Sequence, residues 1–299
     1  MSVRALYDLP APAKLNLFLH VIGRRADGYH LLQSPFVLID WADTLHVELR
    51  ADGRLARHDL GPALPADDLC LRAARALQAA RGTALGADIS IHKQVPWGAG
   101  MGGGSSDAAT VLLALNRLWG LNWPRQRLAS IGLQLGADVP FFIGGQHAFV
   151  EGIGEKLTPM SLPTMRFAVL KPPMAIATRE IFEHPALRRD TVPVIVEGSP
   201  EEAGRIGAPA SWLQGFGKND LQAAAEDRCA EVAQAADCLE ARYGNSRMTG
   251  SGSAVFARVG SAAPPMATEP DGGLSDLPPG WVGRMCRSLD AHPLEAWAA

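Results

Sequence analysis

The chain has 299 residues, of which 47% are hydrophobic, and this length accommodates two domains that each bury a core. Its 28 basic and 31 acidic residues leave a formal net charge of −3 without a long run of one sign, which argues against a nucleic-acid-binding surface or a basic membrane patch. The four cysteines are far apart and form no C-x-x-C pair, as is typical of a reducing compartment. We therefore expect a cytoplasmic protein without a membrane span.

The N-terminal stretch predicts a hairpin. Residues 13–22 alternate between apolar and polar side chains, which predicts one strand with Lys14 and Asn16 on its polar face. Residues 27–28, Asp-Gly, predict a turn between this strand and the apolar run 29–41. The residues directly after the turn are thus placed beside the strand that carries Lys14.

Helices and strands then follow one another along the chain. Leucine spacing and glycine stops predict helices at 67–82, 105–120 and 124–135, and alternation predicts a strand at 87–95. Residues 136–157 indicate only short strands and turns. In the second half, the patterns predict a strand at 166–170, a long helical region at 219–244, a strand at 252–259, a loose loop at 261–280 and a last strand at 281–289.

Five of the seven residues from 98 to 104 are glycines, and the start of a helix follows them at once. Residues 98–103 fit the dinucleotide pattern G-x-G-x-x-G, but no acidic residue occurs between Asp107 and Asp138, where that pattern expects a ribose ligand. The lysine of a P-loop is missing as well, since Gly-Ser stands in its place. The alternatives that remain are a linker or packing turn, and a phosphate cradle built from backbone N–H groups and a helix N-terminus capped by Ser105, Ser106 or Asp107.

The glycine-rich stretch VPWGAGMGGGSSDAA resembles the signature of the galactokinase, homoserine kinase, mevalonate kinase and phosphomevalonate kinase (GHMP) superfamily. Three further stretches, PAKLNLFLHVIGRRADGYHLLQS, GADVPFFI and MTGSGSAVFA, are similar to its family of kinases that act on 4-diphosphocytidyl-2-C-methyl-D-erythritol. The four stretches occur in that family's order across most of the chain. The resemblance implies an α+β fold with two GHMP-kinase-like domains, residues 1–162 and 163–299, and an active site in the cleft between them.

The resemblance also implies a reaction, in which ATP with Mg²⁺ phosphorylates the 2-hydroxyl of this cytidine-bearing substrate in the non-mevalonate isoprenoid route. The implied catalytic residues are Lys14 and Asp138, and it stays open whether Asp138 abstracts the hydroxyl proton or only orients the hydroxyl. The implied ATP-binding residues are Pro96, Gly98, Gly100, Met101, Gly102, Gly103, Gly104, Ser105 and Ser106. The implied substrate-binding residues are Asn16, Gly28, Tyr29, His30, Asp138, Thr178, Phe182, Gly250, Ser251 and Gly252.

Some assignments stay open at this point. Ser105 or Ser106 could ligate Mg²⁺, but no paired acidic metal site can be identified from spacing. Asp68 stands where several relatives carry an adenine-contacting asparagine, which leaves that contact open. The expected partner is the small-molecule substrate alone, with no nucleic acid and no membrane, bound by a monomer or weak homodimer. A homoserine or mevalonate kinase, an NAD(P)-dependent oxidoreductase and a non-enzymatic nucleotide-binding protein are the competing hypotheses.

Overall fold

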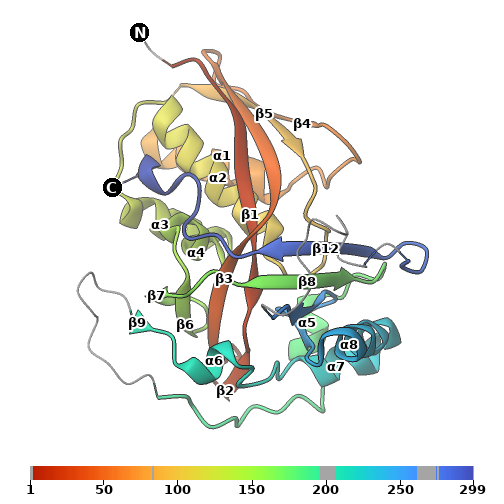
Figure 1. Cartoon of the computed structure of the whole chain (residues 1–299). Helices are drawn as coiled ribbons and strands as arrows, with labels where there is room; N and C mark the ends of the chain where they lie inside the picture. The colour runs from red at the N-terminus through yellow and green to blue at the C-terminus, as the bar shows by residue number, and fades with distance from the viewer. Residues whose placement is uncertain (1–2, 83, 196–205, 261–273, 275, 299) are drawn as a thin grey trace.

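The computed structural model describes residues 3–82, 84–195, 206–260, 274 and 276–298, and it shows two sheets with separate groups of helices (Figure 1). This arrangement confirms the α+β class. The predicted boundary at 162/163 falls between the last long strand of the first sheet and the first strand of the second, and it stays a prediction. No helix in the described part of the chain combines the length and apolar composition needed to span a bilayer.

The first sheet is built around one long strand, β3 (His30–Arg50). Along the order β4-β5-β3-β6-β7-β9 all neighbours are antiparallel except β4 with β5 and β7 with β9, and two more strands, β1 and β2, also pair with β3. The remaining strands are β1 (Ala5–Asn16), β2 (His20–Arg24), β4 (Leu55–Asp59), β5 (Gly86–His92), β6 (Ala148–Gly152), β7 (Lys156–Ser161) and β9 (Ile206–Gly207).

Helices α1 (Leu69–Arg81) and α2 (Gly103–Leu118) pack against this sheet, and α3 (Arg125–Leu135) and α4 (Val139–Gly144) pack against these helices (Figure 1). Helix α2 is buried on nearly every side, because its segment 108–115 carries only alanine, leucine, valine and one threonine. A helix that is apolar all round belongs in a core. The packing of the first sheet and its helices around α2 therefore fixes the position of the N-terminus of α2.

The second sheet has the order β10-β11-β8-β12 and is antiparallel throughout. In Figure 1, β8 and β12 run across the long strands β1 and β3. The strands are β8 (Arg166–Lys171), β10 (Arg247–Met248), β11 (Val255–Arg258) and β12 (Val282–Arg287), and the helices of this half are α5 (Thr178–Phe182), α6 (Ala210–Leu213), α7 (Gln222–Arg228) and α8 (Ala230–Tyr243). The 3₁₀ turn Glu295–Trp297 follows this sheet in sequence but contacts α2 of the first half.

The structure corrects the strand predicted at 13–22 and the segment predicted at 136–157. The predicted strand is interrupted, because β1 ends at Asn16 and β2 begins at His20, and between them Leu19 bridges to Asn219 in the second half. The segment predicted as strands and turns contains the short helix α4, which begins directly after Asp138 with Pro140 in its first turn. Proline is favoured there because its missing N–H has no partner to lose.

Helix boundaries differ as well. The N-cap of α2 is Gly102 at φ +70°, and not a serine or an aspartate, because the glycine loop itself turns into the helix. The long helical region at 219–244 is broken at Cys229, whose φ of −149° is extended. The predicted loop 261–280 lies mostly outside the described residues.

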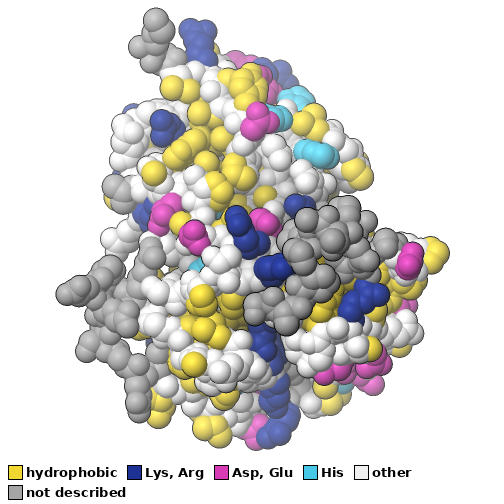
Figure 2. All heavy atoms as spheres, viewed as in Figure 1, with side chains coloured by type: hydrophobic (Ala, Val, Ile, Leu, Met, Phe, Trp, Pro, Cys, Tyr) yellow, Lys and Arg dark blue, Asp and Glu magenta, His cyan; other side chains and the backbone are white. Residues whose placement is uncertain are grey.

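Acidic and basic side chains both occur among apolar ones on the face in Figure 2, in keeping with the near balance of charge.

Candidate active site

A cavity of about 340 Å³ has walls from both halves of the chain. One side is formed by strands β1 and β3 and the glycine loop, residues 96–104, and the other by residues 250–252 and helix α5. Its volume is in the range typical of small-molecule sites. Pro96, Gly98, Gly100, Met101, Gly102, Gly103, Gly104 and Ser105 all line it, whereas Ser106 is buried behind them.

The glycine loop owes its path to glycines in the left-handed region, with φ of +63° at Gly98, +73° at Gly100 and +70° at Gly102. A side chain at Gly100 would place its Cβ 2.2 Å from the carbonyl oxygen of Thr249, so the two loops approach too closely for one. The backbone N–H of Ala254 donates to the carbonyl of Ala99 at 3.2 Å. The glycines therefore join the two halves of the cavity wall and bring backbone close to whatever the cavity holds.

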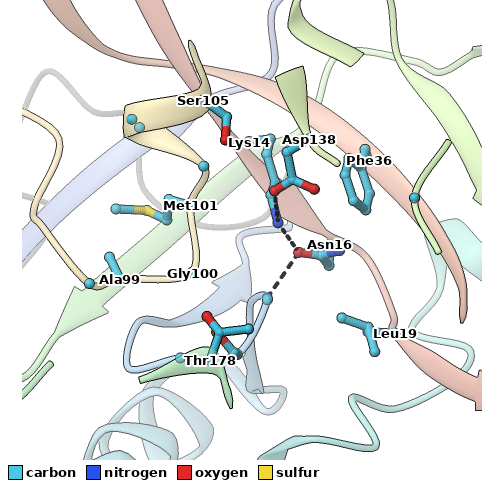
Figure 3. A pocket seen from close by; sticks show the side chains of 18 of the residues that line it. Lys14, Asn16, Leu19, Phe36, Ala99, Gly100, Met101, Ser105, Asp138 and Thr178 are labelled. Carbon is cyan, nitrogen blue, oxygen red and sulfur yellow. Dashed lines mark hydrogen bonds and ion pairs between the residues drawn. The ribbon is translucent and has the colours of Figure 1, made fainter. Parts of the chain in front are cut away.

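Lys14 and Asp138 meet at the cavity, as Figure 3 shows, with Ser105 and Thr178 on opposite sides of the pair. Lys14 Nζ lies 3.8 Å from Asp138 Oδ2, and the backbone N–H of Lys14 donates to the carbonyl of Met101 in the glycine loop at 3.0 Å. Lys14 is buried, whereas the Asp138 side chain is 32% exposed. Burial lowers the pKa of Lys14 below its ordinary value, and the nearby Asp138 carboxylate offsets part of this shift.

Asn16 holds the lysine in place. Its Oδ1 accepts hydrogen bonds from Lys14 Nζ at 2.6 Å, from Thr249 Oγ1 at 3.1 Å and from the Gly250 N–H at 2.9 Å. Its Nδ2 donates to Ser34 Oγ at 2.8 Å. Sequence reasoning missed Thr249 and Ser34, because neither stands in a pattern of its own and both are brought to Asn16 by the fold.

The predicted substrate residues divide into two groups. Asn16, Thr178, Phe182, Gly250, Ser251 and Gly252 line the cavity, and Thr178 Oγ1 lies 2.8 Å from Ser251 Oγ. Gly28 and Tyr29 belong to the β2–β3 turn, and His30 is the first residue of β3. None of the three lines the cavity, although the His30 ring stacks on Phe182 with a centroid distance of 5.0 Å. Tyr29 is 60% exposed. The turn therefore borders the cavity at its Phe182 end.

A buried cluster of three charged side chains, Lys93, Asp43 and Asp107, lies next to the glycine loop. Lys93, which lines the cavity, donates to Asp107 Oδ2 at 2.6 Å and also to Asp43. Burial raises the pKa of Asp107 well above its ordinary value.

Asp68 does not line the cavity; its side chain caps α1 by accepting from the Leu71 N–H, and it pairs with an arginine. Among the described residues, no group of three or more His, Cys, Asp or Glu side chains could hold a metal ion.

The chain is similar to known proteins along its whole length. Residues 68–146 match the N-terminal domain of GHMP kinases and residues 194–267 the C-terminal domain. The chain is 61% identical to the 4-diphosphocytidyl-2-C-methyl-D-erythritol kinase of Methylibium petroleiphilum, covering 100% of both chains. It is 57% identical to the protein of that name from Variovorax paradoxus, over 99% of this chain and 100% of the relative.

Solved structures of three kinases are similar to the structure of this chain. A crystal structure of 4-(cytidine 5'-diphospho)-2C-methyl-D-erythritol kinase is similar with a TM-score of 0.73 and 32% identity, over 94% of this chain and 98% of that chain. The mevalonate kinase of Methanococcus jannaschii gives a TM-score of 0.64 at 14% identity, over 96% and 99% of the two chains. The homoserine kinase from Cytophaga hutchinsonii gives 0.65 at 14% identity, over 98% and 96%. The last two likenesses show the shared fold alone.

Proposed function

Since this chain belongs to the family of 4-diphosphocytidyl-2-C-methyl-D-erythritol kinases, a branch of the GHMP kinases, we propose that its cavity brings ATP and that cytidine-bearing alcohol together. The chain is a kinase that transfers the γ-phosphoryl group of ATP to the 2-hydroxyl of this substrate, within the non-mevalonate isoprenoid route. The observation that supports the binding of both substrates in one cavity is the Lys14–Asp138 pair, at 3.8 Å. The backbone N–H of Lys14 joins this pair to the glycine loop.

Asp138 acts on the acceptor hydroxyl in this proposal. Its carboxylate is the partly exposed member of the pair and can accept a hydrogen bond from the hydroxyl. As the hydroxyl oxygen forms its bond to phosphorus and the bond to the ADP oxygen breaks, the hydroxyl proton passes to Asp138. Phosphoryl transfer is loose, so the proton becomes acidic late and a carboxylate that mainly orients the hydroxyl suffices.

Lys14 supplies positive charge where negative charge gathers on the transferring group. Its ammonium is buried, and Asn16 holds it through the 2.6 Å hydrogen bond. At an effective dielectric constant of ~20, an ammonium ~4 Å from a phosphate oxygen gains roughly 4 kcal/mol before desolvation. A fixed charge of this kind needs no reorganisation during the reaction.

The residues of the glycine loop fit a polyphosphate. Backbone approaches the cavity where side chains would clash, and the N-terminus of the buried helix α2 adds unpaired N–H groups and a positive dipole end. When bound, ATP supplies the phosphoryl group and Mg²⁺ offsets phosphate charge. The hydroxyl of Ser105 is an oxygen donor of the kind that Mg²⁺ prefers, and it lines the cavity.

The acceptor lies toward Phe182 in this proposal. Thr178 and Ser251 offer hydroxyls beside the glycine turn 250–252, and Phe182 with the β2–β3 turn offers rings on which a base can stack. Stacking of this kind contributes ~1–3 kcal/mol per base. We also propose that the enzyme works in the cytoplasm, because its four cysteines are all free.

ADP release by the purified chain tests the assignment. With Mg-ATP, turnover is expected with 4-diphosphocytidyl-2-C-methyl-D-erythritol and not with homoserine or mevalonate. Asp138→Asn is expected to lower turnover by about 10² to 10⁴ while ATP still binds. Asp237→Asn, an exposed aspartate on α8, is the matched control and is expected to keep full activity. Equal ADP release with homoserine or mevalonate would show the substrate assignment to be wrong, and an active Asp138→Asn would remove the role of Asp138.

A further inference from the structure

Strand pairing places Phe36 beside the lysine and the asparagine of the candidate site. In the antiparallel pair of β1 and β3, Asn16 stands opposite Phe36 and Lys14 stands opposite Leu38. Residues directly opposite each other in such a pair share a face of the sheet, and so do residues two apart on one strand. The register therefore places the side chains of Lys14, Asn16 and Phe36 on the same face, with Phe36 diagonal to Lys14.

The ammonium of Lys14 lies over the face of the Phe36 ring. The distance from Lys14 Nζ to the ring centroid is 4.6 Å. Both side chains line the cavity (Figure 3), and both are buried, with 3% of Lys14 and 6% of Phe36 exposed. A cation is attracted to an aromatic face within about 6 Å of the centroid, and the attraction is larger where water is excluded. The contact therefore stabilises the charged form of Lys14.

Few other groups in the described part of the chain compensate the buried ammonium for the water that it loses. Asn16 Oδ1 accepts one hydrogen bond at 2.6 Å, whereas Asp138 Oδ2 lies 3.8 Å away, which is longer than a hydrogen bond. Asp138, at the start of α4, is the charged group that faces Lys14. The glycine loop presents the uncharged Met101 and Gly102 to it. A ring face that replaces lost water therefore has a direct effect on the proton affinity of this amine.

A second ring holds Phe36 in place. Phe141 of α4 packs against it in a T-shaped pair, with a centroid distance of 5.2 Å and an interplanar angle of 79°. Helix α4 begins directly after Asp138. The same short helix thus follows the carboxylate that faces Lys14 and supplies the ring that fixes Phe36, so ring, ammonium and carboxylate keep their relative positions.

We propose that Phe36 is a positioning residue, whose ring face keeps the ammonium of Lys14 charged and in place at the cavity for the transferring phosphoryl group. The inference rests on the proposed function in that Lys14 acts on that group. It predicts that the negative charge on the ring face is required, and not the volume of the ring alone. An aliphatic side chain would cover Lys14 but would leave its charge without this support.

Fluorination of the ring tests its charge while nearly keeping its size. Replacement of Phe36 by monofluoro- and then trifluorophenylalanine, through codon suppression, withdraws negative charge from the ring face in two steps. The titration of Lys14 is followed by carbon NMR of the full chain labelled with ¹³C at the lysine Cε, without nucleotide, and its signal is assigned by its absence in Lys14→Met. We expect the midpoint of this titration to fall by about 1 pH unit in the trifluorinated chain and by less in the monofluorinated one.

Phe167 in the second sheet is the matched control. Its ring is buried against Phe256 with a centroid distance of 5.7 Å, and no cation of the described residues lies over it. Trifluorophenylalanine at this position should leave the titration of Lys14 unchanged.

Kinetics provide the second readout. Phe36→Leu is expected to lower kcat about tenfold and to move the alkaline fall in kcat to lower pH, with the KM for ATP nearly unaltered. Phe36→Tyr keeps a ring face and is expected to retain the alkaline limit of the wild type. A merely structural role for Phe36 would lower the melting temperature without moving this limit.

An unmoved Lys14 midpoint with the fluorines at Phe36, or an equal fall with the fluorines at Phe167, overturns the inference even if the chain phosphorylates the cytidine substrate. Failure of the unaltered chain to release ADP contradicts the proposed function instead, so the two failures are distinguishable. If Phe36→Leu does not fold, as judged by circular dichroism, the titration of the fluorinated chains decides.

Discussion

Asn16 shows how a single amide can set the position of Lys14, the lysine that we propose to act on the transferring phosphoryl group. Its Oδ1 accepts three hydrogen bonds, from Lys14, Thr249 and Gly250, so little of its hydrogen-bonding capacity is left for a substrate. The sequence resemblance assigned Asn16 to substrate binding. The geometry adds that Asn16 orients Lys14 and ties it to the turn that contains Gly250, which joins the two halves of the site through one residue.

Lys14 should give the enzyme an alkaline limit. Burial lowers the pKa of this ammonium below the ordinary 10.5, with Asp138 offsetting part of the shift. If the charge of Lys14 assists transfer, kcat falls as the pH rises through that lowered pKa, which is before a surface lysine would lose its proton. The measurement is kcat against pH on the alkaline side, with circular dichroism to show that the chain stays folded.

Lys14→Arg is the control for this limit. A guanidinium stays protonated over the same range, so the alkaline fall in kcat should disappear even if the overall rate is lower. A wild-type profile that stays flat up to pH 10.5 would show that the charge of Lys14 does not limit the reaction.

At the scale of elements, the glycine loop depends on close contact with the turn 249–252. A Cβ at Gly100 would lie 2.2 Å from Thr249 O and 2.9 Å from Gly252 N, and its φ of +73° disfavours any side chain. Gly100→Ala must therefore push the loops apart at a cost of more than about 2 kcal/mol. We expect at least about a tenfold higher KM for ATP and a lower melting temperature.

Gly144→Ala is the matched control for this loop. A Cβ there meets nothing within 4 Å, and Gly144 ends the helix α4 without a positive φ. Its melting temperature and KM for ATP should stay those of the wild type. Wild-type behaviour of Gly100→Ala would mean that the loops separate at little cost.

Local signals predicted most of the helices and failed where distant contacts decide. The helices α1 and α3 match their predicted ranges, because glycine stops and leucine spacing act within the segment. The single strand predicted at 13–22 is divided between β1 and β2, since Leu19 between them bridges to Asn219, about two hundred residues away in sequence.

The same limit applies to the site. The residues of the glycine loop predict a phosphate cradle, and the resemblance to a family predicts Lys14 and Asp138 as the catalytic pair. The structure brings these residues to one cavity, and their roles stay predictions. Thr249 and Ser34 carried no local signal, because their hydrogen bonds to Asn16 join segments that only the fold brings together.

The whole molecule is closed by its C-terminal segment, which returns from the second sheet to the first layer (Figure 1). Ser288 bridges to Ile39 in β3, and the N–H of Leu289 donates to the carbonyl of Leu38. Further on, the N–H of His292 donates to the carbonyl of Gly145 at 2.7 Å. Since this segment follows the second sheet in sequence and packs on the first, the stability of the two halves is linked through it.

His292 makes this closure sensitive to acid. The side chain is 2% exposed, its Nδ1 accepts from the Leu294 N–H at 3.0 Å, and its Nε2 has no hydrogen-bond partner among the described residues. Burial, with Arg125 nearby, lowers the pKa of His292 from 6.5 to about 4. An unfolded chain takes up this proton below about pH 6.5, whereas the folded chain resists it until about pH 4. The free energy of unfolding therefore falls as the pH falls through that window, by roughly 3 kcal/mol from this group.

His292→Asn isolates that contribution, because an asparagine oxygen can still accept from the Leu294 N–H but takes up no proton in this range. Urea unfolding near neutral pH and at about pH 4.5 gives the acid loss of stability for each chain. The loss should be smaller in His292→Asn than in the wild type by about 2 to 3 kcal/mol. An equal loss in both chains would place the acid sensitivity of the closure in other groups and leave His292 a packing residue alone.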